Sequence, residues 1–419
     1  MRFLYICIAY LIAPLFVGAM VVRGLRDPVH WRGFSQRFGF GQAVRSRSIW
    51  VHAVSVGEVQ AGVPLIEALL KRFPDIPLVL TTVTSTGRAR AEALFGSRAD
   101  VRYVPIDLPG SVRRFFQRIQ PQLAIILETE IWPNLYHRCG RLGVPLVLAS
   151  ARISPRSVAS YRRLVGLFRE TLSHGIFIAA QSAEDAERFV SIGANPARTH
   201  VVGNIKFDFG YPPDMAARGK ELRTLLGADR PVWVAGSTHD QEEEMLIDAH
   251  AQIRQRFPDA LMVLVPRHPP RFGDVAALLR LRGTSFVTRT SKQNVAPDTQ
   301  VYLLDTLGEL PAFYSAGDVA FVGGSLVPIG GHNLLEPAAL SLPIVAGPHN
   351  FNSADIAQML VAHGAVRIVN DAAQLAAVVG GLFADPATRT VMGASGRKAM
   401  DGNRGAVARL MQFLEPLLP

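Results

Sequence analysis

Cysteine is scarce in this chain, and its scarcity bears on both the redox setting and the metal chemistry. The 419 residues include two cysteines, Cys7 and Cys139. Two cysteines cannot form a disulfide framework, so a reducing compartment is the simplest interpretation. No cysteine–histidine cluster has the spacing of zinc ligands. Disulfide and zinc cross-links are therefore both disfavoured.

Three motifs of nucleotide and metal enzymes are also missing. No G-x-G-x-x-G follows a first strand, which disfavours a nicotinamide enzyme, and no P-loop lysine motif exists, which disfavours nucleoside triphosphate hydrolysis. No D-x-D pair of carboxylates appears, so nothing in the sequence requires a divalent metal. We therefore expect a protein that needs neither a metal nor a cofactor.

The chain is long, rich in glycine and strongly basic. A length of 419 residues predicts two globular domains, and 49% hydrophobic residues with 36 glycines suit an α/β fold. The net charge of +10 requires an acidic partner, for which nucleic acid, anionic lipid and a phosphorylated substrate all qualify. No nucleic-acid motif is visible and aromatic residues are not interleaved with basic ones, so we expect no nucleic-acid partner.

The amino-terminal segment is apolar: Phe3–Val22 contains no charged residue. Twenty helical residues reach about 30 Å, the thickness of the hydrocarbon core of a bilayer. Arginines that include Arg23, Arg26 and Arg32 follow the run, which predicts a single anchor in the inner (cytoplasmic) membrane with the body of the protein in the cytoplasm. A cleaved signal peptide, which has a shorter apolar core, and a helix that lies at the membrane surface are the alternatives.

Strands and helices alternate along the rest of the chain. Helical patterns such as Val59–Arg72, Ser111–Ile119 and Ala183–Ile192 separate short apolar runs. This alternation predicts doubly wound parallel sheets with helices on both faces. The predicted strands are Ile49–Ser55, Leu78–Val83, Val101–Ile106, Leu123–Leu127, Pro145–Ala149, Ile176–Ala180, His200–Val202, Val232–Ala235, Leu261–Val265, Ser285–Thr288, Val301–Leu304, Val319–Val322, Pro343–Ala346 and Val366–Val369.

The alternation is interrupted once, in a stretch that contains Tyr211-Pro212-Pro213. We therefore predict an anchor helix at residues 1–25, a Rossmann-like domain at 26–207, a linker at 208–230 and a second Rossmann-like domain at 231–419. The amphipathic terminal helix Ala406–Leu418 can pack back on the first domain. Ligands of such sheets bind beyond the carboxyl ends of the strands.

The stretch Val319–Pro348 reads as strand, glycine-rich turn, helix and strand. Gly330 and Gly331 let the backbone approach a ligand, and a helix that opens at His332-Asn333 would offer N–H groups to a phosphate. Glu336, in the first turns of that helix, can bind two sugar hydroxyls. This combination suits a nucleotide sugar better than a free metabolite.

Acidic residues follow two strands of the first domain. Ser55-Val56-Gly57-Glu58 comes directly after the first strand, where Gly57 permits a sharp turn and Glu58 begins a helix. Glu58 can serve as a general base or merely complement the helix dipole, and the helix N-terminus would keep its pKa low unless the cleft is dry. Glu128 and Glu130 end the fourth strand and can bind sugar hydroxyls or orient a catalytic group.

Hydroxyl and cationic residues follow other strands of this domain. Thr86 can contact sugar or phosphate, although Ser85 or Thr86 can equally be an ordinary N-cap. Four arginines follow the fifth strand: Arg152, Arg156, Arg162 and Arg163. They can bind the phosphates of an acceptor or form a solvated helix face. Lys206 can reach a phosphate, although a lone lysine is usually just solvated.

Polar residues follow two strands of the second domain as well. Ser237 or Thr238 can cap the helix that carries Glu242–Glu244, and this structural account is nearly sufficient. Arg267 and His268 lie beside prolines in a rigid cationic loop, which is a plausible phosphate clamp.

Taken together, these motifs resemble those of the 3-deoxy-D-manno-octulosonic acid (Kdo) transferases of bacterial lipopolysaccharide assembly. The similarity covers nearly the whole chain from the anchor onward, and its motifs occur in the same order. They are WVHAVSVGE, TTVTSTG, PIDLP, ETEIWPN, ARIS, GNIKFD, AGSTH, VPRHPPRF, DTLGEL and GGSLVPIGGHNLLEPA.

The resemblance implies a glycosyltransferase B fold, with two facing Rossmann-like domains and an amino-terminal transmembrane helix. It implies inverting transfer of Kdo from CMP-Kdo to the lipid A precursor, with Glu58 as the catalytic base. The acceptor side is then expected to comprise Ser55, Gly57, Thr86, Glu128, Glu130 and Arg152. The donor side is expected to comprise Lys206, Ser237, Arg267, His268, Gly330, Gly331, Asn333 and Glu336.

The lipid acceptor at an anionic inner-membrane leaflet would also account for the net charge. Two alternatives remain. One is another two-domain nucleotide-sugar enzyme, either a membrane-associated UDP-sugar transferase or a 2-epimerase. The other is a non-catalytic lipid-binding protein, which would have no need of polar residues at so many strand ends.

Overall fold

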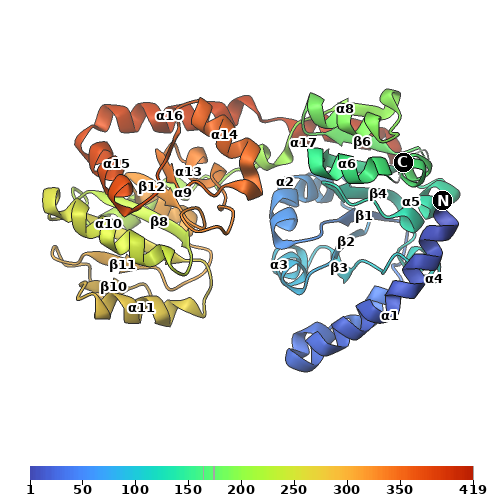
Figure 1. Ribbon diagram of the computed structural model, residues 1–419, viewed down its shortest axis with the longest axis horizontal. Coiled ribbons are helices and arrows are strands. Elements are labelled where there is room, and N and C mark those ends of the chain that lie inside the picture. Colours follow the sequence, from blue (N-terminus) through green and yellow to red (C-terminus); the bar gives the residue numbers. More distant parts are fainter. Residues whose placement is uncertain (164, 173–174, 419) are drawn as a thin grey trace. The chain divides into compact units, whose positions relative to one another are not determined.

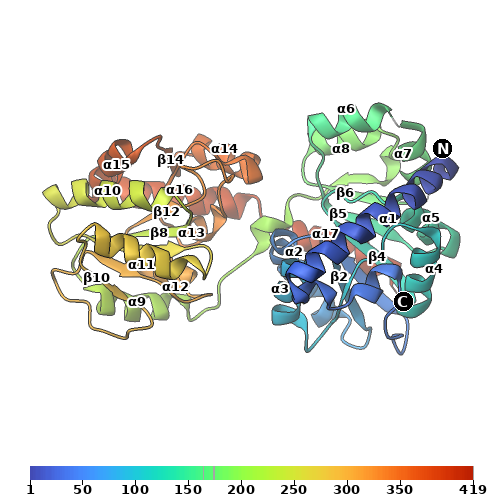
Figure 2. The same ribbon diagram turned by 60° about the horizontal axis from the view of Figure 1, so that its bottom comes forward.

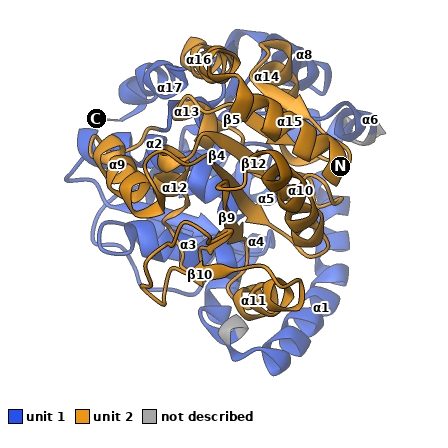
Figure 3. Cartoon of the chain, turned by 90° about the vertical axis from the view of Figure 1, so that its left-hand side faces the viewer, with its two compact units in different colours: residues 1–209, 403–419 blue, residues 210–402 orange. Residues whose placement is uncertain are grey.

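The chain folds into two compact units. The computed structural model describes residues 1–163, 165–172 and 175–418. Unit 1 comprises residues 1–209 and 403–419, and unit 2 comprises residues 210–402 (Figure 3). Each unit is built on one seven-stranded parallel sheet, labelled with its helices in Figure 1.

The sheet of unit 1 has the strand order β3-β2-β1-β4-β5-β6-β7. Its strands are β1 (Ser48–His52), β2 (Leu78–Thr82), β3 (Asp100–Tyr103), β4 (Pro121–Leu127), β5 (Leu146–Ala151), β6 (Phe177–Ala180) and β7 (Thr199–Val201). Its helices are α1 (Arg2–Arg26), α2 (Val56–Arg72), α3 (Ser85–Phe95), α4 (Pro109–Ile119), α5 (Pro133–Leu142), α6 (Pro155–Arg163), α7 (Val165–Leu172), α8 (Ala183–Ser191) and α17 (Ala406–Leu414). Short 3-10 turns lie at η1 (Pro28–Trp31), η2 (Phe34–Phe38), η3 (Pro196–Arg198), η4 (Ile205–Asp208) and η6 (Glu415–Leu417).

The central strands β1, β2, β4 and β5 are almost entirely buried, as expected for a parallel sheet covered by helices on both faces. Successive residues of β1 point to opposite faces. Ile49 and Val51 belong to the core beneath α2, α3 and α17, whereas Trp50 belongs to the core beneath α4 and α5. Because all its strands pair in parallel, their carboxyl ends lie at one edge of the sheet.

The sheet of unit 2 has the strand order β10-β11-β9-β8-β12-β13-β14. Its strands are β8 (Val232–Thr238), β9 (Leu261–Pro266), β10 (Phe286–Thr288), β11 (Val301–Leu303), β12 (Val319–Val322), β13 (Ile344–Ala346) and β14 (Val366–Ile368). Its helices are α9 (Met215–Leu226), α10 (Glu242–Arg256), α11 (Arg271–Leu281), α12 (Leu310–Ala316), α13 (Leu335–Ala339), α14 (Ala354–Ala362), α15 (Ala372–Ala384) and α16 (Pro386–Gly402), with the 3-10 turn η5 (Phe351–Ser353). Trp233 and Val234 of β8 again enter separate cores on the two faces.

The predicted fold class is confirmed, because both units are doubly wound parallel α/β sheets and every strand overlaps a predicted one. The division of the chain differs in detail from the predicted one. The segment taken as a linker contains α9, which packs on α12 inside unit 2. Residues 403–419 belong to unit 1, where α17 packs against α2 through Leu410 and Leu414.

Helix α1 begins at Arg2 and ends at Arg26, so it contains the predicted apolar run. Among the described residues it is the one helix long and apolar enough to cross a membrane. Figures 1 and 2 show it running beside unit 1, with its amino-terminal end next to α5.

Candidate active site

The candidate catalytic residue lies where β1 gives way to α2. Ser55 is the N-cap of α2, and its side chain accepts a hydrogen bond from the Glu58 N–H at 3.5 Å. The Glu58 carboxylate turns back and accepts a hydrogen bond from the Val54 N–H at 2.7 Å. The predicted sharp turn at Gly57 is wrong, because Gly57 lies within the first turn of α2 and its backbone is not in the left-handed region.

The pKa of Glu58 is raised from 4.5 to about 7. Burial of the carboxyl is the main cause, and the negative charges of Glu128 and Glu130 add to it, while the Val54 N–H and Lys206 oppose it. The carboxyl is thus in the dry environment that was the stated exception to a low pKa, and desolvation outweighs the N–H groups of the helix N-terminus. A carboxyl with a pKa near neutrality suits proton abstraction at physiological pH.

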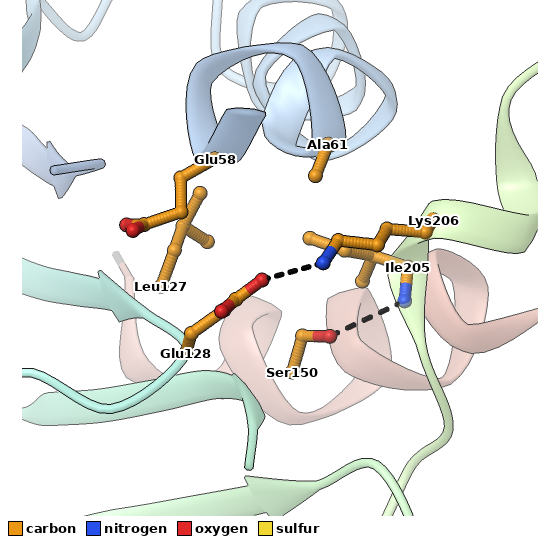
Figure 4. A pocket seen from close by; sticks show the side chains of 7 residues that line it. All are labelled: Glu58, Ala61, Leu127, Glu128, Ser150, Ile205 and Lys206. Atoms are coloured by element: carbon orange, nitrogen blue, oxygen red, sulfur yellow. Dashed lines mark hydrogen bonds and ion pairs between the residues drawn. The ribbon is translucent and has the colours of Figure 1, made fainter. Parts of the chain in front are cut away.

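Glu58 lines a small pocket with six other residues of unit 1 (Figure 4): Ala61, Leu127, Glu128, Ser150, Ile205 and Lys206. The Lys206 ammonium forms an ion pair with the Glu128 carboxylate at 2.7 Å, so it is not a merely solvated lysine. Glu128 has a φ of 57° and Ser150 a φ of 54°, a left-handed backbone that side-chain-bearing residues seldom adopt. Strained residues at the ends of β4 and β5 are typical of a functional site.

Ser150 is a pocket residue that the sequence reasoning missed. Its hydroxyl accepts a hydrogen bond from the Ile205 N–H at 3.4 Å, which ties η4 to the end of β5. Its position at a strand end was the only available signal. The same pocket thus unites residues from β1–α2, β4, β5 and η4.

The other residues predicted to contact the acceptor differ in how they are placed at the carboxyl edge of the unit 1 sheet. The Trp132 indole N–H donates to the Glu130 carboxylate at 2.8 Å, and burial raises the pKa of Glu130. Thr86 is exposed, and the N-cap of α3 is Thr84 rather than Ser85 or Thr86, because Thr84 accepts from the Gly87 N–H at 3.0 Å. A Cβ at Gly87 would lie 3.2 Å from the Ser55 backbone, so the start of α3 packs beside the start of α2.

The arginines after β5 do not line the pocket around Glu58. Arg152 is half-buried at the end of the strand and Arg156 is exposed on α6. The side chains of Arg162 and Arg163 lie outside the described residues.

The glycine-rich loop of unit 2 is held by a buried carboxylate. Glu242, at the start of α10, accepts hydrogen bonds from the N–H groups of Gly324 (2.8 Å), Ser325 (3.1 Å), Leu326 (3.0 Å) and His239 (3.2 Å). Sequence reasoning assigned Glu242 only to the first turn of a helix, because its partners lie more than eighty positions away for three of the four bonds. Glu242 therefore fixes the loop that follows β12.

The glycines of this loop are required by its backbone. Gly324, Gly330 and Gly331 have φ values of 67°, 110° and 73°, and a Cβ at Gly323 would lie 2.5 Å from the Ser237 carbonyl oxygen. Ser237 has a φ of 59° at a bulge in β8, and the N-cap of α10 is Gln241, so neither Ser237 nor Thr238 caps that helix.

Three histidines and an arginine gather beside this loop. The Nε2 atoms of His239 and His332 lie 2.7 Å apart in stacked rings, and the His268 ring centroid is 5.3 Å from that of His239. Burial, followed by the positive charge of Arg267, lowers the pKa of His332 to about 3. Burial, followed by the charge of His268, also lowers the pKa of His239 from 6.5. Both stacked imidazoles are therefore neutral at physiological pH, and Arg267 supplies cationic charge to the cluster.

The predicted helix start at His332-Asn333 is wrong, because α13 begins at Leu335 and has five residues. Such a short helix has little macrodipole to offer a phosphate. Asn333 is exposed, accepts a hydrogen bond from the Leu335 N–H at 3.1 Å and donates one to the Glu336 carboxylate at 3.3 Å. Asn333 and Glu336 are thus brought together, but by a turn and not by a long helix.

No group of three or more His, Cys, Asp or Glu side chains has metal-binding geometry anywhere in residues 1–163, 165–172 and 175–418. The Nε2 atoms of His239 and His332 share a hydrogen bond.

Two Rossmann-like units, one with a carboxyl of raised pKa at its sheet edge and one with a glycine-rich loop beside a cationic cluster, define a glycosyltransferase of the B type. A family model described as 3-Deoxy-D-manno-octulosonic-acid transferase (kdotransferase) matches residues 32–209. The chain is 37% identical to the 3-deoxy-D-manno-octulosonic acid transferase of Haemophilus influenzae over 100% of this chain and 99% of that protein. The chain therefore belongs to the Kdo transferase family.

Two further comparisons agree. The 3-deoxy-D-manno-octulosonic acid transferase of Bordetella pertussis is 38% identical, with 97% of each chain covered. A solved glycosyltransferase from Rickettsia africae has a TM-score of 0.58, covers 89% of this chain and 98% of its own, and is 12% identical. The last comparison shows the shared fold alone.

Proposed function

We propose that this enzyme transfers Kdo from CMP-Kdo to a hydroxyl of the lipid A precursor in lipopolysaccharide assembly, with Glu58 as the general base. The observation that carries the proposal is the Glu58 carboxyl, half-buried at the carboxyl edge of the unit 1 sheet with a pKa of about 7. Family membership supports Kdo as the transferred sugar. The motif resemblance supports CMP as the nucleotide and a lipid as the acceptor.

Each part of the reaction has a candidate residue. The Glu58 carboxylate accepts the proton of the acceptor hydroxyl, whose oxygen forms a bond to the anomeric carbon of Kdo. The bond from that carbon to the CMP phosphate oxygen breaks with inversion, and CMP leaves with the electron pair. The transition state has oxocarbenium character, so stabilising the departing phosphate lowers the barrier.

The donor groups are proposed from unit 2. Arg267 and His268 lie in the exposed loop after β9 and are proposed to bind phosphate. The loop that contains Gly330 and Gly331 is proposed to lie beside the nucleotide. Glu336, oriented by Asn333, is proposed to hold the ribose hydroxyls.

We assign Lys206 to holding Glu128 and tuning the pKa of Glu58, because its ammonium is paired with Glu128 beside Glu58. Contact of Lys206 with the donor phosphate requires this ion pair to open. Ser55, Thr86, Glu128, Glu130 and Arg152 are proposed to surround the acceptor. The reaction is proposed to need no metal.

The enzyme is proposed to work at the cytoplasmic face of the inner membrane. The apolar α1, the arginines that follow it and a net charge of +10 suit an anionic leaflet that carries a phosphorylated lipid acceptor.

A transfer assay tests the proposal. Purified enzyme in detergent receives a CMP-Kdo generating system and a tetra-acylated disaccharide lipid A precursor, and the product mass counts the Kdo units added. Transfer by the wild type that is lost in Glu58→Ala, while CMP binding persists, is the expected result. Absence of transfer from folded wild-type enzyme, with transfer from a UDP-sugar instead, would overturn the assignment.

A further inference from the structure

Two histidines that follow the two central strands of unit 2 form a hydrogen-bonded pair. His239 is the first residue after β8, and His332 lies in the loop that follows β12. Their rings are parallel to within 4°, and their Nε2 atoms are 2.7 Å apart. The groups proposed to bind the donor, which include His268, leave both of these histidines without a role.

The pair lies at a position in the sheet where ligands bind. In the strand order β10-β11-β9-β8-β12-β13-β14, the chain continues from β8 to β9 on one side and from β12 to β13 on the other. The crevice beyond the carboxyl ends of two such strands is the usual ligand site of a doubly wound sheet. In unit 1 the corresponding strands are β1 and β4, and they are followed by Glu58 and Glu128 of the candidate catalytic pocket. The histidine pair thus has the equivalent place within unit 2.

The backbone holds both rings in fixed positions. The His239 N–H donates to the Glu242 carboxylate at 3.2 Å, and the His332 N–H donates to the Gly323 carbonyl oxygen at 3.2 Å. A Cβ at Gly324 would lie 3.1 Å from Cδ2 of His332 and 3.4 Å from Cδ2 of His239, so the glycine-rich loop packs against both rings. Such fixed orientations are what a binding site for one particular group requires.

The hydrogen bond between the rings determines where their protons lie. A bond between two Nε2 atoms requires a proton on one and a lone pair on the other. Because both rings are neutral, as their lowered pKa values indicate, the ring that accepts at Nε2 must carry its own proton at Nδ1. No described residue hydrogen-bonds to the Nδ1 atom of either ring, and neither atom is buried. The pair therefore presents one N–H group that can donate to a ligand.

The charges around the pair favour a ligand with a negatively charged oxygen. The Arg267 guanidinium places positive charge beside both rings, since it contributes to the lowered pKa of each. The carboxylates at the start of α10 are already engaged: Glu242 accepts hydrogen bonds from four N–H groups, and Glu243 is paired with Arg271 at 2.9 Å. An N–H donor in such surroundings suits an oxyanion.

We propose that the His239–His332 pair binds an oxyanion of the donor substrate through this N–H group and so orients the donor for attack. The proposal rests on the proposed function, in which the donor is CMP-Kdo. That donor carries two oxyanions, which are the phosphate that joins it to cytidine and the carboxylate of the sugar acid. Loss of one hydrogen bond to a charged oxygen weakens binding by about 10- to 100-fold.

Glutamine variants of both histidines test the proposal. The amide of His332→Gln or His239→Gln reaches the place of Nε2 and can still bond to the other ring, but it has no second ring nitrogen. Both variants are needed because the Nδ1 proton can reside on either ring. The matched control is His363→Gln, at an exposed histidine that follows α14.

The KM for CMP-Kdo in the transfer assay should rise by about 10- to 100-fold in at least one of the two variants and stay unchanged in the control. Calorimetric titration with CMP, which has the phosphate but no sugar carboxylate, identifies the oxyanion. An equal loss of CMP affinity assigns the pair to the phosphate, whereas unchanged CMP affinity with a raised KM assigns it to the carboxylate. Unchanged KM and unchanged CMP affinity in both variants would overturn the proposal.

A second measurement needs no substitution. In wild-type enzyme labelled with ¹⁵N-histidine, the ring resonances at neutral pH should show one Nδ1–H and one Nε2–H tautomer for the pair. Saturation with CMP-Kdo in the absence of acceptor should shift them. Unchanged resonances in an enzyme that transfers Kdo would overturn this proposal and leave the proposed function intact, whereas wild-type enzyme that neither binds CMP nor transfers Kdo would overturn both.

Discussion

Replacing Glu58 by glutamine separates its chemical role from its structural one. Glutamine keeps the size of the side chain, and its oxygen can still accept the Val54 N–H that Glu58 accepts at 2.7 Å. The amide cannot take a proton from the acceptor hydroxyl. The matched control is Glu67→Gln on the same helix, whose carboxylate is paired with Arg98 on the surface.

The expected loss of rate follows from the role of a general base. Such a group typically contributes about 10²–10⁴-fold, so kcat should fall by that factor in Glu58→Gln and stay unchanged in Glu67→Gln. Because the deprotonated carboxylate is the active form and its pKa is about 7, wild-type kcat/KM should fall about tenfold per unit as pH drops below 7. The glutamine variant should lose this acidic limb.

The same pKa predicts an opposite effect on stability. The Glu58 carboxyl has a pKa of about 7 in the folded protein and an ordinary value of 4.5, so between these values the folded state holds a proton that the unfolded state has lost. Stability is therefore lost as pH rises from 4.5 to 7, by an amount on the order of 3 kcal/mol. Glu58→Gln should unfold at a higher temperature than wild type at pH 8 and at about the same temperature at pH 4.

Steady-state kinetics and calorimetry on the same preparations test both the catalytic and the stability prediction for Glu58. An inactive but more stable variant at pH 8 would establish a buried base that reduces stability in exchange for function. A Glu58→Gln enzyme within a few-fold of wild-type kcat, or an acidic limb that survives the substitution, would refute the reasoning.

Three further predictions concern the surroundings of the site. Lys206→Met removes a charge that lowers the pKa of Glu58, so the acidic limb should move to higher pH; a shift to lower pH would contradict the assigned sign. Glu242→Gln should leave at least two buried N–H groups without an acceptor, which costs roughly 3 kcal/mol and raises the KM for CMP-Kdo, whereas Glu244→Gln at the exposed neighbouring position should change neither. Exhaustive treatment with EDTA should leave transfer unchanged, and a loss that Mg²⁺ or Mn²⁺ restores would show that a metal takes part.

The strands were predictable because their signal is local. A run such as Val319–Val322 is apolar throughout, which is what a strand buried on both faces requires, and the predicted and observed bounds of that strand coincide. Parallel pairing then places all the carboxyl ends of a sheet at one edge. Glu58 and Glu128 could therefore be assigned to one site before their contacts were known.

The sequence predicted the wrong local structure where a short motif is compatible with two backbone conformations. The glycine-rich turn predicted a helix from His332-Asn333, but the helix begins only at Leu335, because Gly330 and Gly331 adopt positive φ values and their N–H groups bond to the Gly324 carbonyl oxygen. Similarly, Thr84 rather than Ser85 or Thr86 caps α3. Both outcomes depend on contacts that a short window of sequence does not contain.

Local sequence patterns were sufficient to predict the two parallel sheets, the apolar helix and the candidate base, since apolar periodicity and strand-end position depend on neighbouring residues. The chemistry of those parts depends on contacts that form only in the folded chain. The pKa of Glu58 depends on burial and on Glu128, Glu130 and Lys206, which are brought to it from distant positions in the chain. The hold of Glu242 on the glycine-rich loop likewise joins distant residues, and solvent exclusion around such groups exists only once the chain has folded.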